Sequence, residues 1–162
     1  SFLKSAQDQF RAKTVEKDYL ALVHGSWPSG VSKVEAPLLK DALGENERIV
    51  RVSDEGKPAL TRFTTEQRFA DATLMRAAPE TGRTHQIRVH LASQGHPIAG
   101  DDKYGDFEQN KQLQKLGLKR MFLHAWQLKF QHPVNARPVT VKAPLPEALQ
   151  QFIDSVQPPV PI

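Results

Sequence analysis

Apolar residues recur along the chain with two spacings, one typical of strands and one typical of helices. Alternation at every second position, together with many strand-forming residues, predicts a series of strands. They cover residues 17–23, 34–39, 48–53, 59–69, 72–78, 121–131 and 137–143. Apolar positions three and four apart predict helices over residues 2–12, 85–93, 108–116 and 146–156. Thr84 lies just before the second helix and is predicted to cap it.

The order of these elements indicates the fold class. The predicted strands outnumber the helices and follow one another in runs, which favours an α+β fold with a mostly antiparallel sheet and flanking helices. The 162 residues fit one domain. Helical spacing begins with the first residues, and no initiator Met precedes Ser1. We therefore interpret residues 1–162 as the C-terminal portion of a larger, N-terminally truncated domain.

The composition narrows the class of partner. Cysteine is absent, which excludes disulfides and thiolate metal sites and suits a cytoplasmic protein. No apolar stretch approaches the ~20 residues that a membrane helix needs, so no membrane partner is expected. The net charge of +4 favours an anionic partner, and nucleic acid is the commonest one.

Residues 80–90 contain many reactive and charged side chains: two arginines, two histidines, a glutamine and two threonines lie around one helix start. Helix starts bind anions through free backbone N–H groups, and Arg83 adds a planar fork suited to phosphate. One turn later Arg88 lies among small and apolar neighbours, where it would need a carboxylate or phosphate partner. On spacing alone, two surface arginines on a polar helix remain the favoured interpretation.

Residues 81–90, Thr-Gly-Arg-Thr-His-Gln-Ile-Arg-Val-His, resemble a signature of RluA-type RNA pseudouridine synthases. Further blocks match the same family in the same order, at residues 17–23, 95–98, 100–105, 122–125 and 132–133. The middle region, residues 47–59, resembles the subgroup that acts on large-subunit ribosomal RNA. Each block alone would be weak, but the series is specific.

The resemblance implies the pseudouridine synthase fold and an isomerisation of uridine in RNA. In this family an aspartate drives cleavage of the N-glycosidic bond, the uracil turns and rejoins the sugar through C5, and the C5 proton is lost. No cofactor or metal is implied, because nothing is oxidised and no external nucleophile enters. The implied partner is large-subunit ribosomal RNA, with transfer RNA as the alternative.

The resemblance also assigns roles to residues of this chain. Arg88 corresponds to the basic residue that pairs with the aspartate. Tyr19 corresponds to the active-site tyrosine, whose ring would stack on the flipped uracil and whose hydroxyl could relay the C5 proton. The other candidates are the pocket residues Leu123, Ile87 and His85 and the RNA-binding residues Arg83, Lys103 and Tyr104. A half-buried strand tyrosine, a core leucine and solvated surface cations are the competing interpretations.

One departure from the family pattern bears on activity. The aspartate signature His-Arg-Leu-Asp, followed by Thr-Ser-Gly, does not occur in the sequence. We expect it to lie before Ser1, together with the small N-terminal RNA-binding domain common in the subgroup. The chain alone is then predicted to be inactive, and an RNA-binding module without catalysis stays open as a second hypothesis.

A third hypothesis, a metal-dependent hydrolase, arises from the histidine and aspartate content. The residues concerned are His85, His90, His96, His124, Asp101 and Asp102. A spacing of five residues puts His85 and His90 on different faces of one helix, and no His-Glu-x-x-His pattern occurs. We therefore expect these histidines to form hydrogen bonds within the fold or to contact RNA, with no metal site, and we expect a monomer.

Overall fold

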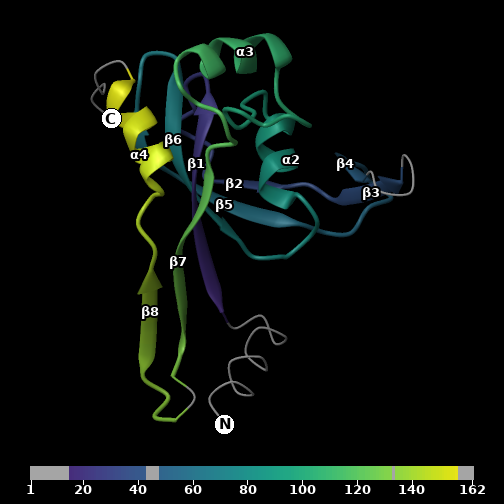
Figure 1. The fold of residues 1–162 in the computed structure, drawn as a ribbon. Helices are drawn as coiled ribbons and strands as arrows, with labels where there is room; N and C mark the ends of the chain where they lie inside the picture. The colour runs from purple at the N-terminus through teal and green to yellow at the C-terminus, as the bar shows by residue number, and fades with distance from the viewer. Residues whose placement is uncertain (1–14, 43–47, 133, 157–162) are drawn as a thin grey trace.

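The structure is a computed structural model that describes residues 15–42, 48–132 and 134–156. The helix predicted over residues 2–12 lies outside these ranges. Within them, a six-stranded antiparallel sheet has the order β2-β5-β6-β1-β7-β8 (Figure 1). Its strands are β1 Glu16–His24, β2 Lys33–Glu35, β5 Leu60–Arg68, β6 Ala72–Pro79, β7 Leu123–Gln131 and β8 Pro138–Lys142. The α+β prediction is confirmed.

The helices of the described residues lie within one or two residues of their predicted bounds. They are α2 Gln86–Ser93, α3 Phe107–Lys115 and α4 Glu147–Ser155. None of the helices in the described ranges is long and apolar enough to cross a membrane.

The central strand β1 is buried on both faces, because alternate side chains point to opposite sides of the sheet. Ala21 and Val23 are fully buried in a core cluster that includes Leu91 of α2. Leu22 belongs to a second cluster on the opposite face, which includes Leu149 of α4. The sheet is therefore covered by α2 on one face and by α4 on the other (Figure 1).

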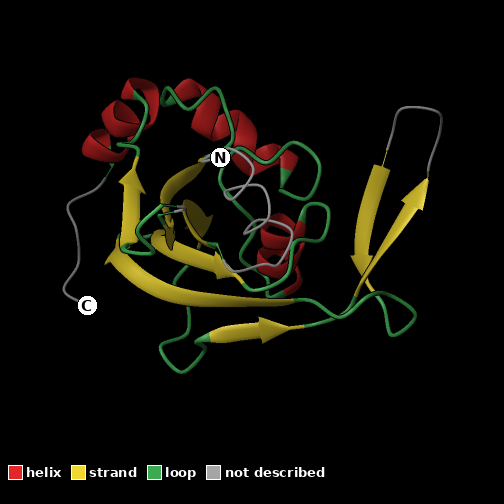
Figure 2. Ribbon diagram, turned by 90° about the horizontal axis from the view of Figure 1, so that it is seen from below, coloured by secondary structure: helices red, strands yellow, loops and turns green. Residues whose placement is uncertain are grey.

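A two-stranded arm, β3 Leu38–Ala42 and β4 Arg48–Val52, projects from the body of the molecule (Figure 2). The single strand predicted over residues 34–39 is therefore wrong. The chain pairs with β5 up to Glu35 and with β4 from Leu38, so it changes sheets at Pro37, which has no N–H to donate to a ladder. The base of the arm packs on α2 through Val89.

Candidate active site

A cleft of about 980 Å³ lies between the start of β1 and the start of α2. Most of the residues proposed from the sequence line it. They are Tyr19, Arg83, His85, Ile87, Arg88 and Leu123. Lys103 and Tyr104 do not. The fold therefore brings together residues that are more than a hundred positions apart in the sequence.

The register of the sheet opens one wall of this cleft. Pairing between β1 and β6 ends at Tyr19, opposite Ala77, whereas pairing between β1 and β7 continues to Glu16. Among the described residues, residues 16–18 thus have a neighbouring strand on one side only, and the cleft lies beside them. Tyr19 lies at the last β1–β6 pair and packs with Leu123 against the core cluster behind them.

The opposite wall begins with a turn that Gln86 fastens to β5. The Gln86 side chain, 4% exposed, donates from Nε2 to the Leu60 carbonyl (3.0 Å) and to Thr61 Oγ1 (2.9 Å). Its Oε1 accepts from the Arg83 N–H (3.0 Å) and from Thr81 Oγ1 (2.6 Å). All four hydrogen-bonding positions of the amide are used, so the turn is closely fixed.

This turn also shows that the predicted Thr84 cap is wrong. The N-cap of α2 is His85, in a left-handed conformation with φ 53°, and no side chain caps the helix. Thr84 is exposed. The tertiary hydrogen bonds of Gln86 organise the turn in place of a local cap.

Arg88 projects from the first turn of α2 and forms a bidentate ion pair with Asp101. Its Nε donates to Oδ2 (2.9 Å) and its Nη2 to Oδ1 (2.8 Å). The side chain of Asp101 is 0% exposed and that of Arg88 is 15% exposed. Asp101 Oδ1 also accepts from the backbone N–H groups of Lys103 (2.9 Å) and Tyr104 (3.0 Å). The expected carboxylate partner of Arg88 is therefore present.

The electrostatics keep this pair ionised. Burial alone would raise the pKa of Asp101, but the hydrogen bonds from Arg88 and from the Tyr104 and Lys103 N–H groups outweigh it, and the pKa lies below its usual value. The hydrogen bond to Asp101 raises the pKa of Arg88, against the effect of burial. A fixed positive charge thus borders the cleft.

Only one edge of the Arg88 guanidinium is used by Asp101. In the described part of the chain, Nη1 has no hydrogen-bond partner. Nη1 and the second hydrogen of Nη2 form the end edge of the guanidinium, which can bind another carboxylate in bidentate fashion. Asp102 Oδ1, on an exposed side chain, lies 3.8 Å from Nη2. An anion that binds the end edge would therefore displace only this exposed contact and leave the Asp101 pair intact.

The Tyr104 ring packs against the Arg88 guanidinium. The ring lies 5.0 Å from the guanidinium, and the Tyr104 hydroxyl accepts from the Val50 N–H (3.0 Å). The same hydroxyl lies 2.7 Å from His85 Nδ1. Burial, then the Arg88 and Lys103 charges, lower the pKa of His85, so a neutral imidazole can accept this hydrogen bond. Tyr104 thus has contacts within the protein, and its proposed role in RNA binding stays a prediction.

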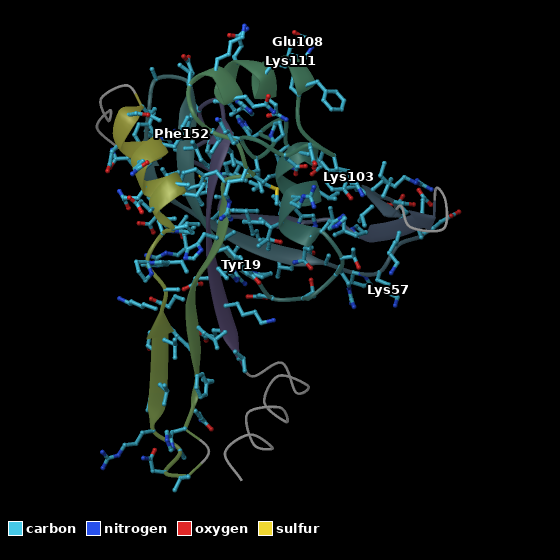
Figure 3. The ribbon with its side chains drawn as sticks, in the orientation of Figure 1. Tyr19, Lys57, Lys103, Glu108, Lys111 and Phe152 are labelled. Atoms are coloured by element: carbon cyan, nitrogen blue, oxygen red, sulfur yellow. The ribbon has the colours of Figure 1, made fainter. Side chains whose placement is uncertain are left out.

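Of the remaining sequence candidates, Arg83 and Ile87 line the cleft and Lys103 does not. Arg83 lines the cleft and donates from Nε to the Pro58 carbonyl (2.9 Å). Ile87 is 7% exposed and belongs to both the cleft and the core. Lys103 is exposed and lies outside the cleft (Figure 3).

The histidines considered as metal ligands hydrogen-bond within the fold, as expected. His90 bonds to Thr61 Oγ1 (2.8 Å) and to the Ala36 carbonyl (2.9 Å). His96 and His124 each bond to a backbone carbonyl at 2.8 Å. Across residues 15–42, 48–132 and 134–156, no group of three or more potential ligands is arranged to hold a metal ion.

Sequence reasoning missed Asp101 and Gln86 as site residues. The need of Arg88 for a carboxylate was a signal for Asp101, which lies thirteen positions later in a block already noted. Gln86 gave no such signal, because its four partners lie on β5 and on the preceding turn.

Comparison with known proteins identifies the family of the chain. The family described as RNA pseudouridylate synthase matches residues 1–93. A curated relative from Escherichia coli strain K12, named ribosomal large subunit pseudouridine synthase C, is 54% identical over 97% of this chain and 50% of its own length. The relative of that name from Pasteurella multocida is 52% identical over 97% of this chain and 48% of its own length. The chain spans about half the length of these relatives.

Solved structures give the same result for the fold. Human RNA pseudouridylate synthase domain containing 1 superposes with a TM-score of 0.73 at 28% identity, over 92% of this chain and 63% of that one. Human RNA pseudouridylate synthase domain containing 4 gives a TM-score of 0.72 at 25% identity, over 93% of this chain and 66% of that one. The match over residues 1–93, the relatives and the fold together show that the chain belongs to the RNA pseudouridylate synthase family.

Proposed function

We propose that the full-length protein containing this chain isomerises uridines of large-subunit ribosomal RNA to pseudouridine. The observation that carries the proposal is the cleft in which Arg88, paired with Asp101, and Tyr19 occur together. The relatives named ribosomal large subunit pseudouridine synthase C support the choice of RNA. The chain itself is proposed to be the C-terminal portion of the catalytic domain.

In the proposed mechanism, Arg88 holds a catalytic aspartate supplied by a segment outside this sequence. Asp101 occupies the side edge of the guanidinium, so the aspartate would bind the end edge, formed by Nη1 and Nη2. Two carboxylates on one guanidinium share its charge. The positive charge keeps the aspartate ionised and oriented toward the sugar.

The sheet wall would hold the uracil. The Tyr19 ring offers a stacking surface, and Leu123 and Ile87 add apolar contact at the floor. The N1–C1′ bond breaks, the uracil turns, and C5 bonds to C1′. The C5 proton is then removed, with the Tyr19 hydroxyl as the proposed relay, and N1 takes up a proton. Reactant and product are isomers, so the proposed reaction needs no added oxidant, reductant or co-substrate.

The target uridine must leave its stack to enter the cleft, at a cost of a few kcal/mol. Arg83 lines the rim of the cleft and suits a phosphate next to the flipped nucleotide. We further propose that the protein works in the cytoplasm, where its substrate is made. We also propose that it works as a monomer.

The test is to incubate the full-length protein with unmodified large-subunit ribosomal RNA and to map pseudouridine by chemical modification and primer extension. Conversion at defined uridines, with a chelator present and no cofactor added, is the expected result. Absence of conversion in ribosomal RNA would overturn the proposal, and conversion in transfer RNA alone would correct the substrate. Residues 1–162 alone are expected to be inactive.

A second candidate is an RNA-binding protein without catalysis. It is favoured by one observation, that Arg88 already has a buried carboxylate partner within the chain and needs no other for stability. This candidate predicts RNA binding by the full-length protein with no conversion of uridine. The same assay therefore distinguishes the two functions.

A further inference from the structure

A second concave surface lies beside α3 and has no role in the proposed chemistry. This α3 hollow has a volume of about 420 Å³, and its walls come from α3, residues 100–102 and residues 118–121. Met121 lines both the α3 hollow and the catalytic cleft. A ligand strand that leaves the cleft past Met121 would therefore enter the hollow.

The framework of the α3 hollow is fixed by hydrogen bonds. Asn110 of α3, 8% exposed, accepts from the Gly100 N–H (3.0 Å) and donates to the Asp101 carbonyl (2.8 Å). Gly100 has φ 83°, and a Cβ there would lie 2.7 Å from the Arg120 carbonyl oxygen, so only glycine permits this close approach. The hollow is thus preformed, and its loop also carries Asp101, the partner of Arg88.

The lining combines an exposed aromatic ring with cations. Phe107 is 70% exposed, which is costly for a large apolar side chain without a partner. Lys111, Lys119 and Arg120 line the same hollow, opposed by Asp102 alone among the charged lining residues. Lys111 lies 3.6 Å from Glu108, an exposed pair that offsets little of the lysine charge. An exposed ring beside excess positive charge suits single-stranded nucleic acid.

We propose that the α3 hollow binds single-stranded RNA on one side of the target uridine. A base stacks on Phe107 while Lys111, Lys119 and Arg120 neutralise phosphates. This inference rests on the proposed function, because it needs RNA in the cleft. Lys111 lies at one end of the molecule, well away from Tyr19 (Figure 3), so the hollow would take nucleotides a few positions from the target.

The test uses the full-length protein and two substitutions in the hollow, Phe107→Ala and Lys119→Gln. Leu116→Ala and Lys115→Gln are the matched controls, because Leu116 is 69% exposed, Lys115 is exposed, and neither lines the hollow. The probe is an oligouridine of about 16 nucleotides. Its Kd is measured by fluorescence anisotropy over a range of salt concentrations, and kcat is measured at saturating ribosomal RNA.

We expect Phe107→Ala to raise Kd about tenfold. Lys119→Gln should reduce the slope of log K against log salt by about 0.7, the value for one phosphate contact on a single strand. The control variants should match wild type in Kd, in salt slope and in kcat. Equal Kd and salt slope in hollow and control variants would overturn the inference. A full-length protein that binds oligouridine but converts no uridine would instead refute the proposed function.

Discussion

Arg88 on α2 and Tyr19 on β1 line the same cleft, yet the protein holds them by different means. Arg88 is fixed by side chains, since two hydrogen bonds tie it to Asp101 and the Tyr104 ring lies against it. Tyr19 is fixed by strand pairing with Ala77 and Ala125. Within the described part of the chain its hydroxyl makes no hydrogen bond.

Because Arg88 and Tyr19 are held in different ways, substitutions at the two residues should have different effects. A change in the helix wall, made of Arg88, Asp101 and Tyr104, should affect both stability and activity, because the same hydrogen bonds serve folding and positioning. A change at the tip of Tyr19 should affect activity alone. Arg51 and Asp41 form an exposed ion pair at 2.7 Å. This pair serves as a control for substitutions in the buried Arg88–Asp101 pair.

The largest effect is expected from Arg88→Lys. Lysine keeps the charge but cannot bind Asp101 on one edge and a second carboxylate on the other. Activity of the full-length protein should fall about 10²–10³-fold, the usual cost of losing an oriented donor at a reacting group. The variant should still fold and bind RNA, but with lower stability, because lysine cannot make the bidentate pair with Asp101. Kinetics with ribosomal RNA, thermal unfolding and RNA binding measure the three quantities.

Arg51→Lys is the matched control for this substitution, since its pair is exposed and lies on the arm. It should leave activity and unfolding near wild type. Full activity in Arg88→Lys would refute the pairing role assigned to Arg88.

Asp101→Asn should give the next largest effect. It removes one partner of a buried ion pair and leaves Arg88 less firmly held, so unfolding should cost about 3 kcal/mol less. Displacement of the guanidinium by about 1 Å would lower activity about 10²-fold. The counterpart Asp41→Asn, in the exposed pair, should cost at most about 1 kcal/mol and leave activity unchanged. Equal losses in the two variants would show that burial of the pair is unimportant.

The sequence predicted the positions of strands and helices better than it predicted which strands and side chains contact one another. Strands such as β1 and β7 and the helices α2 to α4 follow from apolar spacing, which is a local property. The break at Pro37 was missed because the alternating pattern continues across it, while the neighbouring strand changes from β5 to β4. The proline was the available signal.

The prediction of site residues from the sequence has the same limit. Resemblance supplied Arg88, Tyr19 and Leu123, and the cleft contains all three. It did not supply Asp101 as the partner of Arg88, or Gln86 as the side chain that forms the turn. Both depend on which backbone groups the folded chain brings within reach, and local propensity carries no such information. Thr84, a good capping residue by type, was overruled for that reason.

The chain contains two tyrosines, Tyr19 on β1 and Tyr104 in the helix wall. Replacing each in turn by Phe tests whether the two walls respond differently. Tyr19→Phe should leave thermal unfolding unchanged, because the hydroxyl makes no hydrogen bond in the described residues. It should lower kcat about tenfold, less than a full general-base effect, because water in the large cleft can replace the relay. The ring remains, so KM should not change.

Tyr104→Phe should behave in the opposite way. It leaves the Val50 N–H without its partner and should lower stability by about 1–2 kcal/mol. Its effect on kcat should be smaller than that of Tyr19→Phe, because the ring against Arg88 remains. Loss of stability in Tyr19→Phe, or of activity alone in Tyr104→Phe, would contradict the division between the two walls.

The smallest effect is expected in the pH dependence of stability. Hydrogen bonds from Arg88 and from two backbone N–H groups hold the pKa of Asp101 below its unfolded value, in spite of burial. A lowered carboxyl pKa contributes stability that is complete above the unfolded value, near about 4, and is lost as the pH falls through the folded value. The wild type should therefore lose its advantage over Asp101→Asn as the pH falls below about 4. His90 titrates without a contribution from Asp101 and cancels in the difference. Burial lowers the pKa of His85 and the Asp101 charge opposes that shift, so the comparison also contains the His85 response. Unfolding followed from about pH 6 to pH 3 measures the gap, and a gap that stays constant to the lowest pH would show that Asp101 stabilises the helix wall by packing and not by its charge.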